Sequence, residues 1–258
     1  MPDPRLHIDG DIAAGASLDL TDAQGSKLTR VLRLGVGAGV RVFNEWGEWG
    51  ATIAVADKKH VRVTVGAMLS PPRASRDVTL LFAPLKRDAT DLVVEKATEL
   101  GVRRISPVFT SRTIVEAVRI ERWALVAAAA AEQSERFDIP QIDNAVPLMR
   151  ALDGWDTNRP LVWCDESGDN PSLPWGGQSP ASPPMLEALR GRPAPRAAAL
   201  LIGPEGGFTP EEQRLLRMQP FVIGVSLGPR ILRAETAVIA GLALLQAAWG
   251  DLAGDTVS

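Results

Sequence analysis

The segment AAALLIGPEGGFTPEEQ, residues 197–213, indicates the fold class of this chain. It opens with an apolar run of the length and composition of a buried strand, and a glycine-rich loop then leads into a helix. The start of that helix is well marked, because Thr209 can cap it, Pro210 suits its first turn and Glu212 completes a capping box. A buried strand that feeds a helix through a tight loop is typical of α/β proteins. Glu205, on the loop itself, is not explained by capping.

The same alternation of strand and helix runs through the C-terminal two thirds of the chain. The further apolar segments expected to be strands are DVTLLFAP (77–84), RRISPVF (103–109), RPLVWCDE (159–166) and FVIGVSLG (221–228). The segments with helical periodicity are ATDLVVEKATEL (89–100), IERWALVAAAAAEQSERF (120–137), the stretch from 209 and the stretch 234–249. Apolar strands that alternate with helices predict a parallel sheet covered on both faces.

The N-terminal part of the chain reads differently. Segments 40–44, 50–56 and 60–69 are rich in β-branched residues and are separated by glycine-rich or charged turns. One helix is expected within 22–34, where Leu28, Val31 and Leu32 share a face. We therefore predict a small β-barrel domain over residues 1–70, a linker over 71–76 and an α/β domain over 77–258.

A segment rich in proline, glycine and serine, residues 167–196, interrupts the strand–helix alternation. It fits a solvated insertion or a functional lid, and its composition favours the insertion.

The composition excludes several classes of protein. The chain has one cysteine, Cys164, and two histidines, His7 and His60, so an intramolecular disulfide is impossible and neither a cysteine-cluster metal site nor a Ser-His-Asp triad finds its partners. The longest apolar run, 237–250, is too short to span a membrane, and the N-terminus has no signal-peptide pattern. We expect a cytoplasmic, metal-free protein that does not associate with membranes.

The charge balance neither requires nor forbids a nucleic-acid partner. The formal net charge is −3, yet residues 73–122 hold ten Lys and Arg against seven Asp and Glu. Backbone phosphates respond to such local patches rather than to the total charge. RNA binding is thus permitted by the composition but not indicated by it.

Three polar segments follow predicted strands and should meet at one edge of the sheet. They are the loop after Ile202, the segment SLGPRILRAETA (226–237), and the loop that carries Ser111 and Arg112. Ligands of open α/β sheets bind outside the carboxyl ends of the strands. The first loop lacks the lysine of a P-loop and the spacing of a dinucleotide fingerprint, so neither phosphate-binding pattern applies.

These segments together resemble a known family. ATELGV (97–102), EQSERFDIP (132–140), IGPEGGFTPEE (202–212) and LGPRILRAETA (227–237) occur in the order found in bacterial 16S ribosomal RNA uridine N3-methyltransferases of the SPOUT superfamily, and LTRVLRLGVGAGVRVFN (28–44) is similar to their N-terminal RNA-binding domain. The resemblance extends from about residue 6 to residue 249. It implies an α/β domain with a deep trefoil knot, preceded by a PUA-like β-barrel, and a homodimer that methylates a decoding-centre uridine of the small ribosomal subunit.

The resemblance also implies a site for S-adenosylmethionine in three loops. The implied cofactor residues are Ile202, Gly203, Glu205, Gly206, Gly207, Ser226, Leu227, Gly228, Ile231, Leu232, Arg233 and Thr236. Because this cofactor has no phosphate, it needs no lysine cradle, and its adenine requires apolar walls and close backbone instead.

Two residues are candidates for catalysis. Arg233, with Arg230 second, is suited to hold the uracil oxygens, and Glu205 is placed to accept the N3 proton or to make a structural contact within the cofactor loop. The basic residues expected to bind RNA are Arg5, Arg30, Arg33, Lys86, Arg87, Arg112, Arg136 and Arg230.

Two departures from the family pattern stand out: EWGEWG (45–50) where relatives tend to have an Asp-Gly turn, and the extended segment 167–196. Three alternatives remain: a knotted methyltransferase for another ribosomal or transfer RNA base, an inactive RNA-binding homologue, and a conventional nucleotide-binding α/β enzyme.

Overall fold

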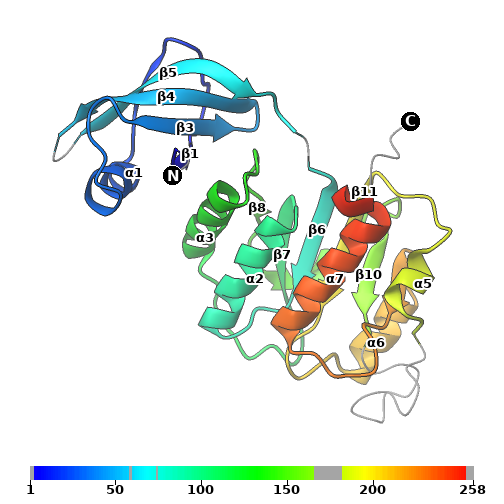
Figure 1. The fold of residues 1–258 in the computed structure, drawn as a ribbon. Helices are drawn as coiled ribbons and strands as arrows, with labels where there is room; N and C mark the ends of the chain where they lie inside the picture. Colours follow the sequence, from blue (N-terminus) through cyan, green and yellow to red (C-terminus); the bar gives the residue numbers. More distant parts are fainter. Residues whose placement is uncertain (1–2, 58–59, 74, 166–181, 254–258) are drawn as a thin grey trace. The chain divides into compact units, whose positions relative to one another are not determined.

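The structure is a computed structural model that describes residues 3–57, 60–73, 75–165 and 182–253. The chain divides into two compact units (Figure 1). The first comprises residues 1–74 and 131–138, and the second comprises residues 75–130 and 139–258. The inclusion of 131–138 in the first unit differs from the expected contiguous division of the chain.

The first unit is built on a five-stranded sheet with the order β1-β3-β4-β5-β2. Its strands are β1 (Arg5–His7), β2 (Ser17–Asp19), β3 (Gly39–Asn44), β4 (Gly47–Ala56) and β5 (Val61–Ser70). β1 pairs with β3 in parallel and the remaining pairs are antiparallel. Alternate residues of β3, β4 and β5 fill one core, as the period of two requires: Val40, Val42, Ala51, Ile53, Val61, Val63 and Val65. This is the β domain that the sequence predicted.

The helix expected within residues 22–34 is shorter than its periodicity suggested. α1 (Asp22–Ser26) begins with a capping box between Thr21 and Gln24, then continues as a π-helical turn, η1 (Lys27–Val31). The wider turn changes the angular spacing of the side chains. Leu28 is buried, whereas Val31 and Leu32 are 73% and 41% exposed. The three residues, which the helical periodicity placed on one face, therefore differ in burial.

A buried ion pair ties segment 131–138 to the sheet of the same unit. Arg5 is 5% exposed, pairs with Glu48, and stacks with its guanidinium carbon 3.5 Å from the centre of the Phe43 ring. Its Nη1 donates to the backbone oxygen of Ala131 at 3.0 Å. Burial lowers the pKa of Arg5 from its ordinary value, and Glu48 counteracts this shift. Arg5 is thus an interior residue of the protein.

The second unit contains a parallel sheet with the order β12-β10-β11-β6-β7-β8, and β9 also pairs with β7. The strands are β6 (Asp77–Phe82), β7 (Arg104–Phe109), β8 (Gln141–Ile142), β9 (Val146–Pro147), β10 (Leu161–Cys164), β11 (Ala197–Ile202) and β12 (Val222–Val225). The predicted parallel sheet is confirmed. The trefoil knot implied by the family resemblance stays a prediction.

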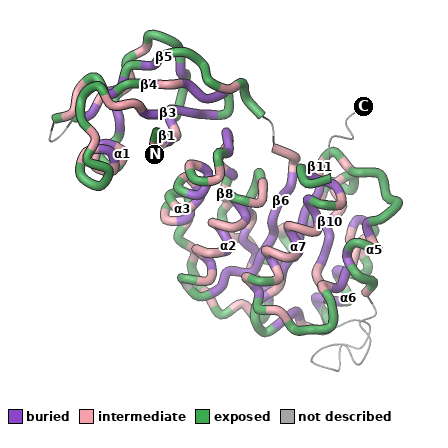
Figure 2. The backbone as a smooth tube through the Cα atoms, viewed as in Figure 1, coloured by how far each residue is buried: buried purple, intermediate pink, exposed green. Residues whose placement is uncertain are grey.

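Both faces of this sheet are buried, as the uninterrupted apolar runs predicted (Figure 2). Leu80 and Leu200 belong to the core on one face, and their neighbours Leu81 and Leu201 belong to the core on the other. α2 (Arg87–Glu99), α3 (Ile120–Gln133), α5 (Met185–Leu189) and α7 (Ala234–Trp249) contribute to the first core, and α4 (Leu148–Leu152) and α6 (Pro210–Arg217) contribute to the second. The last residues of α3 belong to the first unit. A short 3₁₀ turn, η2 (Asp251–Ala253), follows α7.

No helix among the described residues is long and apolar enough to cross a membrane.

The buried pair predicts a large stability effect. Glu48→Gln removes the charge that compensates buried Arg5, so the free energy of unfolding should fall by about 3–5 kcal/mol. Urea denaturation followed by tryptophan fluorescence measures this change as a lower midpoint. Glu45→Gln changes an exposed acid next to the same hairpin and should leave the midpoint unaltered. Equal midpoints for the two variants would show that the pair contributes little.

Candidate functional site

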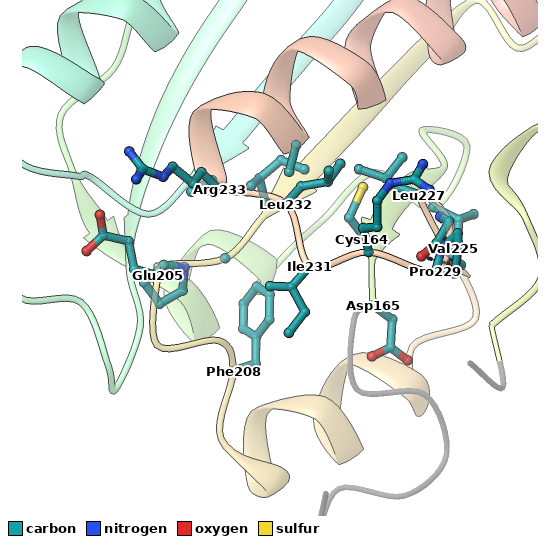
Figure 3. A pocket seen from close by; sticks show the side chains of 18 residues that line it. Cys164, Asp165, Glu205, Phe208, Val225, Leu227, Pro229, Ile231, Leu232 and Arg233 are labelled. Carbon is teal, nitrogen blue, oxygen red and sulfur yellow. Dashed lines mark hydrogen bonds between the residues drawn. The ribbon is translucent and has the colours of Figure 1, made fainter. Parts of the chain in front are cut away.

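A pocket of about 890 Å³ opens at the carboxyl ends of the adjacent strands β10, β11 and β12 (Figure 3). Its walls come from the residues that follow these strands and from the first turn of α7. The lining residues are Cys164, Asp165, Ile202, Gly203, Pro204, Glu205, Phe208, Val225, Ser226, Leu227, Gly228, Pro229, Arg230, Ile231, Leu232, Arg233, Ala234 and Ala237. Most of them are apolar, and the charged side chains are few.

The loop after β11 supplies part of the pocket floor. A Cβ on Gly203 would lie 2.6 Å from Cε2 of Phe208, so only glycine allows the backbone to approach this ring. Phe208 itself is buried and packs edge-on against Trp163, with ring centres 5.8 Å apart. The backbone N–H of Gly207, with φ +66°, donates to Pro204 O at 2.9 Å and closes the turn. The glycines of this loop thus serve packing and turn formation.

The loop after β12 supplies the opposite wall. Ser226 Oγ accepts a hydrogen bond from the backbone N–H of Gly228 at 3.1 Å, and Gly228 has φ +107°, a conformation that favours glycine. The chain then passes through Ile231 and Leu232 to Arg233, the N-cap position of α7. Ile231 lies near the ring of Phe208, and both contribute apolar surface to the pocket (Figure 3).

Charged groups lie at different depths in the pocket. The carboxylate of Asp165 is buried and accepts hydrogen bonds from Arg217 Nη2 at 2.8 Å and from Ser182 Oγ at 3.1 Å. Glu205 and Arg233 are exposed and lie at the same end of the pocket (Figure 3). The site therefore combines apolar walls with a carboxylate and a guanidinium near one opening, and a buried ion pair elsewhere.

The turn after β7 meets the loop after β11. The backbone N–H of Ser111 donates to Glu212 Oε1 at 2.8 Å, and Arg112 Nη1 donates to Gly206 O at 2.8 Å. The predicted convergence of these segments at one edge of the sheet is confirmed.

Most residues assigned to the cofactor by the family resemblance line this pocket. They are Ile202, Gly203, Glu205, Ser226, Leu227, Gly228, Ile231, Leu232 and Arg233. Gly206, Gly207 and Thr236 do not line it. Gly206 faces Arg112, Gly207 forms the turn described above, and Thr236 is exposed on the first turn of α7.

The basic residues expected at RNA differ widely in exposure. The expectation that Arg5 and Arg136 bind RNA is corrected, because their side chains are buried. They are 5% and 9% exposed and make ion pairs inside the first unit, Arg5 with Glu48 and Arg136 with Asp138. The exposed candidates are Arg30, Arg33, Lys86, Arg112 and Arg230. The side chain of Arg87 lies outside the described part of the structure.

Sequence reasoning missed the contribution of β10 to the pocket. Cys164, within the predicted strand 159–166, is partly exposed and lines the pocket with Asp165. The signal was present, because Asp165 follows an apolar strand directly, and the carboxyl-edge rule applies to β10 as it does to its neighbours. The other residues missed are Pro204, Phe208, Val225, Pro229, Ala234 and Ala237. Within the described residues, no group of three or more His, Cys, Asp or Glu side chains could hold a metal ion.

Comparisons with known proteins agree with this arrangement. Residues 72–246 match a family described as an RNA methyltransferase domain, and residues 20–66 match one described as an RNA methyltransferase PUA domain. The chain is 30% identical to ribosomal RNA small subunit methyltransferase E of Rickettsia conorii, over 93% of each chain. Its identity to the Synechocystis protein of the same name is 33%, over 94% of this chain and 77% of that protein.

Solved structures show the same relationship. A methyltransferase of Legionella pneumophila, solved with bound SAM, matches this chain with a TM-score of 0.81 and a sequence identity of 32%. The match covers 97% of this chain and 100% of that one. A ribosomal RNA small subunit methyltransferase E from Neisseria gonorrhoeae, bound to S-adenosyl methionine, has a TM-score of 0.80 and 28% identity over 96% of this chain and 99% of that one.

A β domain joined to a parallel sheet with a loop-lined pocket at its carboxyl edge, together with the matched families, defines the class of protein as an RNA methyltransferase. Within that class, the chain belongs to the family of ribosomal RNA small subunit methyltransferase E.

The floor of the pocket gives a prediction about packing. Gly203→Ala places a methyl group against the confined ring of Phe208, so the free energy of unfolding should fall by about 1–3 kcal/mol. Gly206→Ala is the matched control in the same loop, since its Cβ would lie at an ordinary 3.4 Å from Arg112 Cβ. Thermal unfolding compares the two. If both variants unfold at the same temperature, Gly203 is not confined as described.

Proposed function

We propose that this protein transfers the methyl group of S-adenosylmethionine to N3 of a specific decoding-centre uridine in 16S ribosomal RNA, acting on the small ribosomal subunit in the cytoplasm. The observation that carries the proposal is the pocket of about 890 Å³ that three strand-end loops enclose, in a chain of this family. Relatives of similar fold are bound to this cofactor in their solved structures.

The residues of the pocket fit this cofactor. Its adenine needs apolar walls, and Ile202, Phe208, Leu227, Ile231 and Leu232 provide them. Backbone must come close to the ligand, and Gly203 and Gly228 allow this where the loops turn.

Bound S-adenosylmethionine supplies an electrophilic methyl group. The chain must hold the uracil N3 in line with that group, and such alignment contributes roughly 7–11 kcal/mol to the barrier reduction. Arg233 is our choice to hold the uracil oxygens, on which negative charge develops as N3 loses its proton, because a guanidinium presents several donors in one plane. Glu205, at the same end of the pocket, is our candidate to accept that proton.

Exposed basic residues of both units are suited to contact RNA phosphates. Arg30 and Arg33 on the first unit, and Lys86, Arg112 and Arg230 on the second, are exposed and can neutralise phosphates. By its family resemblance we further propose that the protein works as a homodimer. A knotted methyltransferase for another RNA base, and an inactive RNA-binding homologue, are the alternatives.

One assay separates these alternatives. The protein incubated with labelled S-adenosylmethionine and undermethylated small subunits should incorporate label into 16S RNA, and nucleoside analysis should identify 3-methyluridine. Heat-inactivated protein is the control. No incorporation would contradict the enzymatic proposal, and label in another base would contradict only the choice of uridine N3.

Two variants test the roles at the pocket opening. Arg233→Ala should lower kcat by about 10²–10³ and change the cofactor Kd little, since its donors act on charge that develops during the reaction. Glu205→Gln should lower kcat by about 10²–10⁴ if the carboxylate accepts the proton. Single-turnover rates and calorimetric binding measure both quantities.

Each outcome has a contrary reading. Equal losses of rate and cofactor affinity in Arg233→Ala would make this residue a cofactor ligand instead. Full turnover of Glu205→Gln with unchanged affinity would mean that Glu205 is not the base.

A further inference from the structure

We propose that Glu212 is a positioning residue, which holds the turn at 110–113 against the loop that carries Glu205 so that Arg112 stands at the pocket opening to bind the nucleotide beside the target base. The inference rests on the function proposed above. From the sequence, helix capping alone explained this carboxylate; the inference gives it a role in the reaction as well.

Glu212 uses both of its oxygens. Oε2 accepts from the backbone N–H of Thr209 at 2.8 Å and lies 3.1 Å from the Thr209 hydroxyl, which completes the capping box of α6. Oε1 accepts from the backbone N–H of Ser111 at 2.8 Å, a contact across 101 residues of sequence. A capping role needs only the first oxygen. The other oxygen, Oε1, links the start of α6 to the turn that follows β7.

The turn that Glu212 holds is closed by two hydrogen bonds of its own. Thr113 N–H donates to Thr110 O at 3.1 Å, and Thr110 N–H donates to the Thr113 hydroxyl oxygen at 2.9 Å. Moving Ser111 therefore moves the neighbouring residue with it. Arg112 lies within this turn and reaches the loop after β11 through its contact with Gly206 O.

The position of this turn decides what lies beside Glu205. Lys86, Arg112, Pro204 and Glu205 line a small hollow of about 10 Å³, and the last two also line the main pocket. Lys86 and Arg112 are exposed, and each carries a positive charge next to the opening at which the base must enter. A phosphate next to the target nucleotide is the chemistry that such a pair of cations recognises.

The two donors that Glu212 joins require a carboxylate of this length. Glutamine can accept at one oxygen only, so it cannot satisfy Ser111 and Thr209 together. Aspartate keeps the charge that favours a helix N-terminus but is shorter by one methylene, so it can cap α6 without reaching Ser111. Glu212→Asp thus separates the two roles.

The first experiment tests the tether without any substrate. Hydrogen exchange of the Ser111 amide should accelerate at least tenfold in Glu212→Asp and stay unchanged in Glu211→Gln, the adjacent exposed acid whose side chain lies 3.8 Å from Arg214. Unchanged exchange in Glu212→Asp would overturn the inference.

The second experiment tests the consequence for the reaction. Glu212→Asp should lower kcat/KM for the small subunit by about tenfold or more, as expected for a lost contact to a charged group, and leave the cofactor Kd within twofold. Thr209→Ala is the matched control for the cap: it should lower the unfolding temperature and keep kcat/KM per folded molecule.

A double variant distinguishes positioning from a general loss of structure. If Glu212 acts through the turn, Arg112→Ala and Glu212→Asp together should lower kcat/KM no further than Arg112→Ala alone. Additive losses, or parallel losses of cofactor binding and activity, would overturn the inference while the wild-type protein remains active. A wild-type protein that methylates nothing would instead overturn the proposed function.

Discussion

The parallel pairing of β10 between β11 and β12 is the constraint on which the site depends. Parallel strands bring their carboxyl ends to one edge, so the residues after all three strands are brought together by the pairing of the strands. Burial of both faces of the sheet fixes this pairing, because a slip of one residue would exchange the cores to which Leu200 and Leu201 belong. The packing of the sheet therefore determines where the pocket lies, and the sequence of the loops determines what lines it.

Within that frame, the motif GPEGGFTPEE performs three separate physical tasks. Gly203 permits contact with Phe208, Gly207 closes a turn with a positive φ, and Thr209 with Glu212 begins α6. Only the first of these acts directly on the pocket. The residues of this motif therefore have separate structural roles, and the motif is not a single binding element.

The two domains and the parallel sheet can be predicted from the sequence because their patterns are local. Uninterrupted apolar runs mark β6, β10 and β11, and an alternation with a period of two marks β3 to β5. It fails where the outcome depends on distant partners. The charge on Arg5 suggests a surface residue, yet Glu48 and Phe43 make its burial possible from other strands. Asp165 could be recognised as a residue that follows an apolar strand, but the position of that strand, β10, between β11 and β12 depends on the other strands and is not encoded in its own segment. The π-helical turn at Lys27–Val31 likewise cannot be read from helical periodicity, which assumes a constant turn.

Glu205 and Glu212 show why burial has to be known before a carboxylate is given a role. The two residues lie in one motif, seven positions apart, and sequence alone favours the loop residue for chemistry and the capping residue for structure. In the folded chain Glu205 is exposed at the pocket opening, where it can meet a substrate and exchange a proton. Glu212 is 7% exposed and already accepts hydrogen bonds at both oxygens, so it can act on a substrate only through the residues that it holds. The proton transfer proposed at the opening and the positioning proposed behind it thus fall to different carboxylates, and each proposal predicts a lower rate for a different physical reason.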